Sequence, residues 1–306
     1  MFLSDLRSSK RARRNLRWGL LFIAPWIVGF LAFNLYPAVA SLYYGFTRFS
    51  IVKSPRWLGL DNYAKLLTRD HYFVKTLTNT LYMVAIGVPI TIAVSFVLAL
   101  ILNMEVKGMA VYRTIYYLPT VMPPVAGTLL WLWILNPQYG ILNHMLGFIG
   151  LRSPAWFAVP TWSKPALIMM GVWGSGAGTV MYLAALQGVP QRLYEAAMLD
   201  GAGWLQRTLR ITIPLVSPVT LFQLITGIIG AFQIFTQAYI IGGTGRGTSG
   251  DPREALLFYA LYLYRQAFEY LHMGFASAMA WILFLIILAV TIVMIKTSAY
   301  WTHYEL

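Results

Sequence analysis

Two carboxylates, Glu195 and Asp200, lie in one short polar segment whose other side chains are small or apolar. No residue between Gln191 and Leu199 breaks a helix, and one face of that helix would carry Leu193, Ala196, Ala197 and Asp200. The alanines allow close approach by another helix or a groove, and the carboxylates can pair with a partner's arginine or lysine. These residue types indicate a surface that binds another protein rather than a catalytic site. The alternative is a surface helical hairpin whose charges are only solvated.

Glycine and proline predict how this segment bends. Pro190 suits the first turn of a helix, and Gly201 permits the left-handed backbone that ends one sharply. A second short helix from about Ala202 to Arg210 leads to Pro214, where the next apolar run begins. We call this predicted pair of helices, residues 188–213, the polar loop.

A second group of polar side chains interrupts the apolar run after the polar loop at helical spacing: Gln223, Thr226, Gly230, Gln233 and Gln237. The run before the polar loop has Gly171, Gly174 and Gly178 on one face, with Trp173 and Ser175 beside it. Amides are costly in a membrane unless they are hydrogen-bonded, so the glutamine face must point to other helices or to a cavity. Helix packing explains the glutamines as well as a solute path does, and it explains the glycines more readily.

Other motifs for chemistry are absent. The sequence has no cysteine, which excludes disulfides, thiolate metal sites and thiol catalysis. It has no Gly-x-x-x-x-Gly-Lys-Ser/Thr phosphate loop, and we interpret the glycine-rich run 242–250 as an outer loop because it lacks the lysine and opens no helix. Trp131 and Trp133 are typical of interfacial anchors rather than ligands.

Composition determines the class of protein. Of 306 residues, 58% are hydrophobic and only 11% are charged, too few charges to cover a soluble domain. Six uncharged apolar segments approach or exceed the roughly 20 residues that a helix needs to cross a bilayer. They are about Trp18–Phe46, Thr76–Asn103, Thr114–Leu135, Pro165–Leu186, Pro214–Ile241 and Met273–Ile295. The net charge of +13 does not indicate nucleic-acid binding, because the basic residues lie at the ends of these segments.

Basic residues before the first segment predict the orientation: Lys10, Arg11, Arg13, Arg14 and Arg17. The positive-inside rule places this end in the cytoplasm, and an even number of spans returns the C-terminus and the polar loop to the same side. The first outer loop is also basic, so the denser N-terminal cluster decides the orientation.

Two local features accompany the spans. Prolines inside them should kink their helices, namely Pro25, Pro37, Pro89, Pro119, Pro123 and Pro124. The outer segment Trp57–Leu67 predicts an amphipathic helix with Asp61 as its N-cap and with Leu60, Ala64 and Leu67 on its apolar face.

The polar loop resembles the EAA loop of ABC importer membrane subunits, on the residues Glu195-Ala196-Ala197, Asp200-Gly201-Ala202, Ile211, Pro214, Leu215 and Pro218. The rest of the chain resembles the six-span sugar permeases of the maltose/glycerol-phosphate/lactose-type branch. The supporting strings are Leu58-Gly59-Leu60-Asp61-Asn62-Tyr63, Asn79-Thr80-Leu81, Tyr112-Arg113-Thr114, Leu118-Pro119, and Gly140 with Asn143. Each of these strings is weak alone and they are persuasive together, and the resemblance covers nearly the whole chain.

This resemblance implies an all-α polytopic membrane protein with six transmembrane helices and a cytoplasmic helix-turn-helix coupling loop. Residues 1–17 would be a basic cytoplasmic N-terminus, and residues 18–75 the first span and outer loop. Residues 76–297 would form a five-helix core that contains the polar loop, and residues 298–306 a cytoplasmic tail. The membrane would be the inner membrane of a bacterium or archaeon.

The resemblance also implies partners and roles. A cytoplasmic ATPase dimer would bind ATP and Mg²⁺, an extracytoplasmic binding protein would deliver a sugar, an oligosaccharide or a glycerol phosphate type of solute, and a second permease would complete a heterodimer. This chain would bind no cofactor and catalyse no reaction. Glu195 would pair with a cation of the ATPase, Ala196 and Ala197 would pack into its cleft, and Gly201 would set the bend. The spans flanking the loop would contact the solute, which makes Trp173, Gly174, Gln233 and Gln237 the candidates.

Two other functions must be weighed. A transporter driven by an ion gradient usually carries ionisable residues in mid-membrane, and the six segments contain none. An intramembrane hydrolase could use Ser175, but Trp173 stands where the Gly-x-Ser-x-Gly motif requires glycine.

Overall fold

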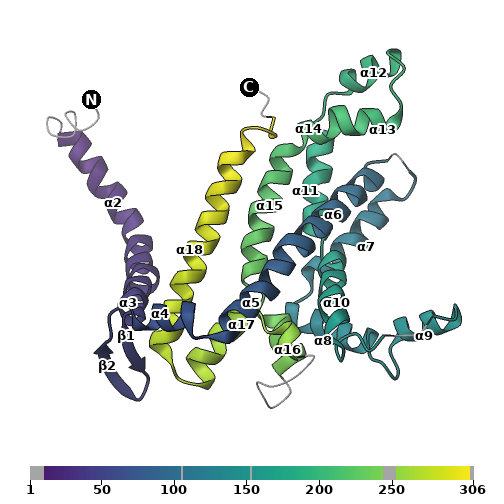
Figure 1. Cartoon of the computed structure of the whole chain (residues 1–306). Helices are drawn as coiled ribbons and strands as arrows, with labels where there is room; N and C mark the ends of the chain where they lie inside the picture. Colours follow the sequence, from purple (N-terminus) through teal and green to yellow (C-terminus); the bar gives the residue numbers. More distant parts are fainter. Residues whose placement is uncertain (1–9, 105, 152–153, 244–252, 304–306) are drawn as a thin grey trace. The chain divides into compact units, whose positions relative to one another are not determined.

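The computed structural model describes residues 10–104, 106–151, 154–243 and 253–303, and nearly all of its regular structure is helical (Figure 1). The chain divides into two compact units. The first unit extends to Thr68 and includes Gln266–Trp281, and the second contains Arg69–Arg265 and the chain from Ile282 onward. The predicted glycine-rich outer loop, 242–250, lies outside the described residues from position 244 on.

The first unit begins with an apolar helical rod: α2 (Lys10–Phe30), the π-helix η1 (Leu31–Leu35) and α3 (Tyr36–Gly45). Its residues Arg14–Gly45 are long and apolar enough to cross a membrane. A two-stranded antiparallel hairpin follows, β1 (Thr47–Ser50) with β2 (Lys53–Trp57). The prediction of an all-α fold is therefore wrong at this point, because strands of four and five residues are too short for their alternation to stand out from the sequence.

Helix α4 (Asp61–Thr68) packs against the base of this hairpin. The side-chain amide of Asn62 donates hydrogen bonds to the carbonyl oxygens of Gly45 and Thr47, both at 2.9 Å. Asn62 and Leu66 are buried, one turn apart, whereas the predicted apolar face of Leu60, Ala64 and Leu67 is exposed. The predicted helix is present, and its apolar face is free to lie on a membrane surface, which stays a prediction.

The second unit holds the remaining helices. They are α5 (His71–Tyr82), η2 (Met83–Gly87), α6 (Val88–Leu102), α7 (Met109–Val121), α8 (Pro124–Ile134), α9 (Ile141–Phe148), α10 (Pro160–Trp173), α11 (Gly176–Gln187), α12 (Gln191–Leu199), α13 (Trp204–Arg207), η3 (Thr208–Thr212), α14 (Ile213–Leu215), α15 (Ser217–Phe232), α16 (Thr236–Gly243), η4 (Arg253–Leu256) and α17 (Tyr259–Tyr264). The π-helix η5 (Arg265–Glu269) and the long helix α18 (Met273–Ser298) belong partly to each unit.

Each of the six predicted apolar segments overlaps a helix or helix pair that could cross a membrane. Four are unbroken: Arg14–Gly45, His71–Leu102, Ser217–Gly242 and Met273–Ser298. The other two are bent pairs, α7 with α8 at 104° and α10 with α11 at 47°. By length and composition, the described residues therefore hold four membrane-spanning helices, or six if each bent pair is one span.

Not every predicted proline interrupts its helix. Pro37 and Pro89 each lie two residues after a π-helical turn, η1 and η2 respectively, inside helices that stay unbroken. A wide turn accommodates the hydrogen bond that a proline ring cannot make, so these two helices continue. The 104° bend does fall at Pro123 and Pro124, but the 47° bend falls at Gly174 and Ser175, where there is no proline.

Helices α6, α11 and α15 form the centre of the second unit. Ala99, Tyr182, Leu183, Leu186 and Val216 make one buried cluster. Two hydrogen bonds join α11 to α15: Tyr182 donates to Thr220 Oγ1 at 2.8 Å, and the amide of Gln223 donates to the carbonyl of Gly178 at 3.1 Å. Together they connect α11 and α15 at two levels.

Gly176 sets how closely α11 approaches α7, which yields a test of this packing. A Cβ atom at Gly176 would lie 2.5 Å from the carbonyl oxygen of Tyr116 and 2.6 Å from Thr120 Oγ1. We expect Gly176→Ala to lower the free energy of unfolding by about 1–3 kcal/mol. Gly230→Ala is the matched control, since its Cβ would meet nothing within 4 Å and alanine favours the helix. Equal thermal unfolding midpoints of the two variants in detergent would contradict this packing.

Candidate functional site

A cavity of about 640 Å³ lies inside the second unit, and we call it the bundle cavity. Its walls come from η2, α6, α8, α10, α11 and α15, with Gln237 of α16. Both helix breaks line it, one through Met122, Pro123 and Pro124, the other through Trp173, Gly174 and Ser175. The residues at which the helices bend are thus part of the cavity wall.

The sequence explains where the helices break. Pro123 and Pro124 have no N–H to continue α7, and Met122 takes the extended backbone that a residue before proline prefers. At the second break the amides of Gly174 and Ser175 still donate to the carbonyls of Met170 and Val172, both at 3.1 Å. The second break therefore bends the chain without leaving these two amides unpaired.

Three of the four predicted solute-path residues line the bundle cavity: Trp173, Gly174 and Gln237. Gln233 does not, because it follows the last residue of α15 and is exposed. Gln223 and Thr226 line the cavity too, as do Gly171 and Gly178. Since Gln223 also bonds to Gly178, the glutamine face serves helix packing and faces the cavity at the same time.

Trp131 is a cavity residue that the sequence analysis missed. It is only 9% exposed, and its ring meets Trp173 edge-on at a centroid distance of 5.8 Å. The prediction that it is an interfacial anchor is therefore wrong. Pro124, Gly127, Thr128 and Trp131 share one face of α8 and all line the cavity, so their helical spacing held the signal. Trp133 is 70% exposed, and its role as an anchor stays a prediction.

Two buried donors in the cavity wall have no protein partner. The indole nitrogen of Trp131 and the hydroxyl of Thr120 are both buried without a hydrogen bond, and both residues line the cavity. Buried polar groups nearly always have a partner, so these two donors are exceptions, and each would have to turn toward the cavity to meet a bound molecule or water. No lining residue is charged. The cavity can therefore offer hydroxyl, amide and indole hydrogen bonds and aromatic faces to an uncharged group.

No catalytic or metal-binding constellation accompanies this cavity. Over the described ranges, no group of three or more His, Cys, Asp or Glu side chains could hold a metal ion. Ser175 lines the cavity, but no histidine or carboxylate lines it beside the serine. The site is built to contain a molecule.

The polar loop has the predicted two-helix form. Helix α12 covers Gln191–Leu199, and Pro190 occupies the position just before its first residue rather than within the first turn. Gly201 has a φ of +78°, which confirms the predicted left-handed turn. The amide of Gly201 donates to the carbonyl of Met198, and that of Ala202 to the carbonyl of Ala197, the paired bonds of a Schellman motif.

One side-chain contact holds the bend of the polar loop. The hydroxyls of Tyr194 on α12 and Thr212 on η3 lie 2.9 Å apart in a hydrogen bond. Pro214 lies in α14 and leads into α15. Figure 1 places α12 and α13 at the opposite end of the second unit from α9 and α16. The C-terminal segment is at the polar-loop end, because the amide of His303 donates to Ser217 Oγ at 2.9 Å.

The exposed surface of the polar loop is both acidic and apolar. Glu195, Ala196, Asp200 and Gly201 are exposed, whereas Ala197 and Ala202 are half-buried. The sequence analysis did not single out the apolar residues beside them, of which Leu199 is 90% exposed and Trp204 is 63% exposed. Large apolar side chains this exposed at the tip of a helical turn are typical of a contact surface.

A bundle of broken apolar helices around an uncharged cavity, with an exposed helical turn at one end, is the arrangement expected of a membrane permease. The family model of the binding-protein-dependent transport system inner membrane component matches residues 87–298, and the chain belongs to this family. It is a multi-pass inner-membrane permease subunit of an ABC importer, a transport component rather than an enzyme. The ion-driven transporter and the intramembrane hydrolase are therefore not its function.

Individual relatives cover almost the full length. The probable ABC transporter permease protein YesP of Bacillus subtilis is 39% identical over 302 residues, which are 98% of this chain and 96% of that protein. The trehalose/maltose transport system permease protein MalF of Thermococcus litoralis is 30% identical over 298 residues, 96% and 97% of the two chains. A chain of a bacterial alginate ABC transporter, solved with an alginate pentasaccharide-bound periplasmic protein, has the same fold, with a TM-score of 0.81 and 24% identity over 99% of each chain.

A comparison of Trp131 with Trp156 tests whether the Trp131 indole N–H lacks a hydrogen-bond partner. Both are 9% exposed, but the Trp156 indole donates to Asn143 Oδ1 at 2.7 Å, whereas the Trp131 indole has no acceptor. We expect Trp156→Phe to lower the free energy of unfolding by about 1–3 kcal/mol more than Trp131→Phe does, because both changes lose packing but only Trp156 loses a hydrogen bond. The measurement is thermal unfolding in detergent. A loss at Trp131 equal to that at Trp156 would mean that the Trp131 donor has a structural partner.

Proposed function

We propose that this subunit moves a sugar or sugar-like solute through the bundle cavity by alternating access. The solute would be an oligosaccharide or of the glycerol phosphate type, delivered by an extracytoplasmic binding protein. The relative from Thermococcus litoralis is named for trehalose and maltose, and the solved neighbour for alginate, which supports a sugar. The single observation that carries the proposal is the cavity wall, which holds hydroxyl, amide and aromatic side chains and no charged residue.

The proposed contacts come from both helix breaks. Trp173, Gly174 and Gln237 line the cavity as the sequence predicts, and we add Trp131 and Thr120. Aromatic faces suit the apolar side of a sugar ring, and hydroxyl, amide and indole groups suit its hydroxyls. We leave out Gln233, since it has no place in the cavity wall.

We further propose six spans with both termini in the cytoplasm. Each bent pair would then be a single broken span, which is tolerated in a membrane where the break lines a cavity. The basic N-terminal cluster supports a cytoplasmic N-terminus, and the contact of His303 with Ser217 supports a C-terminus on the side of the polar loop. This topology keeps the predicted division, with residues 76–297 as the transmembrane core.

The polar loop would couple the cavity to a cytoplasmic ATPase dimer that binds ATP and Mg²⁺. Glu195 and Asp200 would pair with cations of the ATPase, and Leu199 and Trp204 would fill its apolar groove. The loop connects α11 directly to α15, and both helices line the cavity. Three cross-connections between its two sides, Tyr182–Thr220, Gln223–Gly178 and Tyr194–Thr212, support movement of the hairpin as one body.

A second permease would complete the translocation path as a heterodimer. The rod Arg14–Gly45 in the first unit is long and apolar enough to cross a membrane, where it must face lipid or protein. A partner there is consistent with a path shared by two chains.

Reconstitution tests this function. The purified chain in proteoliposomes should show neither ATP hydrolysis nor uptake. Addition of the second permease, the ATPase and the binding protein should give ATP hydrolysis that rises with the transported sugar. Uptake by the lone subunit under an ion gradient would contradict the proposal.

Charge reversal tests the role of the polar loop. Glu195 is exposed, so Glu195→Lys should fold normally, but it should repel the cation of the ATPase. We expect ATPase binding at least about tenfold weaker, equivalent to about 1.4 kcal/mol. Asp61→Lys is the matched control, because Asp61 is equally exposed on the predicted outer side. Equal affinities of the two variants in a pull-down titration would show that Glu195 does not face the ATPase.

A further inference from the structure

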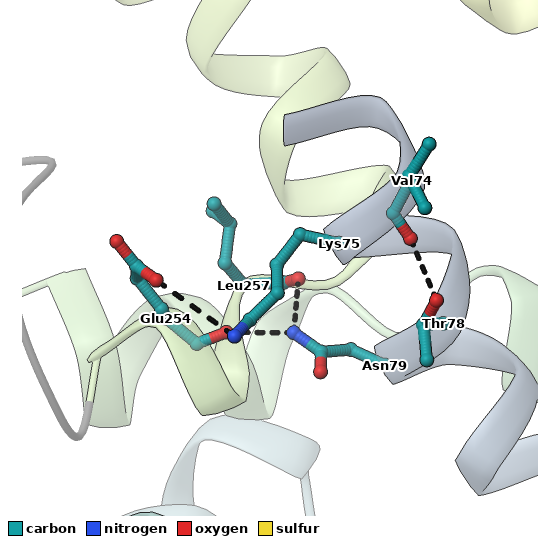
Figure 2. A network of polar contacts seen from close by, with 6 residues as sticks. All are labelled: Val74, Lys75, Thr78, Asn79, Glu254 and Leu257. Carbon is teal, nitrogen blue, oxygen red and sulfur yellow. Dashed lines mark hydrogen bonds and ion pairs between the residues drawn. The ribbon is translucent and has the colours of Figure 1, made fainter. Parts of the chain in front are cut away.

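A second, smaller cavity of about 310 Å³ lies in the second unit, and we call it the lysine pocket. It is lined by Lys75, Asn79, Pro160, Thr161, Lys164, Glu254 and Ala255, from α5, α10 and η4. Figure 2 shows the network formed by α5 and η4 at this pocket. None of the functions proposed above uses these residues.

Hydrogen bonds to α5 hold the pocket in shape. Asn79 is 3% exposed, and its side-chain amide donates to the carbonyl oxygens of Glu254 and Leu257 at 2.6 and 3.0 Å (Figure 2). One residue further along α5, Thr80 Oγ1 accepts a bond from the amide of Tyr259 at 3.0 Å. Both ends of the segment that carries Glu254 are therefore fixed against α5. The pocket is preorganised and does not depend on a chance meeting of surface side chains.

Positive charge exceeds negative charge in this pocket. Lys75 Nζ lies 3.8 Å from Glu254 Oε2, too far for a hydrogen bond (Figure 2). Lys164 Nζ lies 4.9 Å from the centroid of the Tyr82 ring, and no described carboxylate is within ion-pair distance of it. Two ammonium groups and one carboxylate leave an excess of one positive charge. The Lys75–Glu254 pair is partly exposed, at 45% and 37%, so an incoming anion can compete for Lys75.

Two helices that line the lysine pocket, α10 and the continuous α5–η2 helix, also line the bundle cavity. Lys164 lies one helical turn before Ile168 on α10, and Asn79 lies one turn before Met83 on the α5–η2 helix. Ile168 and Met83 both line the bundle cavity. Because α10 and α5 begin at the end remote from the polar loop, the proposed topology places the lysine pocket at the outer mouth of the path. The bundle cavity itself offers no charged residue.

We infer that the lysine pocket is an entry subsite for the anionic group of an acidic solute, a carboxylate or a phosphate on a sugar-sized molecule. Its volume is at the lower limit of small-molecule sites, which suits one acidic sugar unit rather than an oligosaccharide. Lys75 and Lys164 would bind the anion, and the uncharged part of the solute would face the bundle cavity. The inference rests on the proposed function only for the direction in which the solute moves, from the lysine pocket toward the bundle cavity.

Lysine labelling tests the subsite without any partner. The full chain in lipid nanodiscs is treated with acetic anhydride, and acetylation of each lysine is followed by peptide mass spectrometry. The probes are D-glucuronate and sn-glycerol 3-phosphate, each compared with its uncharged counterpart, D-glucose or glycerol, at equal ionic strength. We expect either anion to slow labelling of Lys75 and Lys164 at least about twofold, the change that half-occupancy of a site produces. Glucose and glycerol should have no effect.

Two controls sharpen this test. Lys65 lies 5.3 Å from the centroid of the Phe275 ring, a contact like that of Lys164 but outside the pocket, and its labelling should not respond to the anions. Glu254→Gln removes the competing carboxylate and keeps the backbone carbonyl that Asn79 binds, so it should give protection at lower anion concentrations.

Equal labelling with and without both anions, in the native chain and in Glu254→Gln, would overturn the inference. A second outcome, with the binding protein added, would also overturn the solute assignment: slower labelling of the two lysines in the absence of any anion. The group that the lysines bind would then be a carboxylate of the binding protein. The labelling needs no ATPase, so this inference can fail while coupling through the polar loop holds, and the reverse is equally possible.

Discussion

The structure depends on one constraint: inside a membrane, a helix can break only where its exposed backbone groups are covered by protein or face a polar cavity. Here both sharp breaks, at 104° and 47°, line the same cavity. The first break follows from Pro123 and Pro124, and the second retains its hydrogen bonds at Gly174 and Ser175. Both breaks therefore shape the wall of this cavity.

The same helices connect the polar loop to the bundle cavity. Helix α11 begins at the second break and leads through Pro190 into α12, and the chain returns through η3 and α14 to α15. The Tyr182, Gln223 and Tyr194 hydrogen bonds tie the two sides of this hairpin at three levels. Each bond adds only about 0.5–1.5 kcal/mol, but together they restrict sliding of α11 against α15. A force on the polar loop would thus reach the wall of the bundle cavity.

Much of this could be predicted from the sequence. Long uncharged segments predicted the spans because a helix that crosses a bilayer must be long and apolar. Gly201 predicted the turn because few other residues adopt the left-handed backbone conformation found there. The break at Pro123 and Pro124 was predictable for the same kind of local reason.

Other features could not be predicted because they depend on contacts between distant segments. The burial of Trp131 requires Trp173 on another helix, and the buried face of α4 depends on carbonyls of Gly45 and Thr47. The break at Gly174 has no proline to mark it, and π-helical turns allow the helices to continue past Pro37 and Pro89. The lysine pocket joins residues about 180 positions apart, as the bond from Asn79 to Leu257 demonstrates.

The central claim is that the polar loop lies in the cytoplasm and carries force from an ATPase to the bundle cavity. Because the chain has no cysteine, Asp200→Cys and Asp61→Cys each introduce a single thiol without further changes. In intact cells, a membrane-impermeant maleimide should modify Asp61→Cys and leave Asp200→Cys unmodified until the membrane is permeabilised. Modification of Asp200→Cys from outside, in a variant that still transports, would contradict the account.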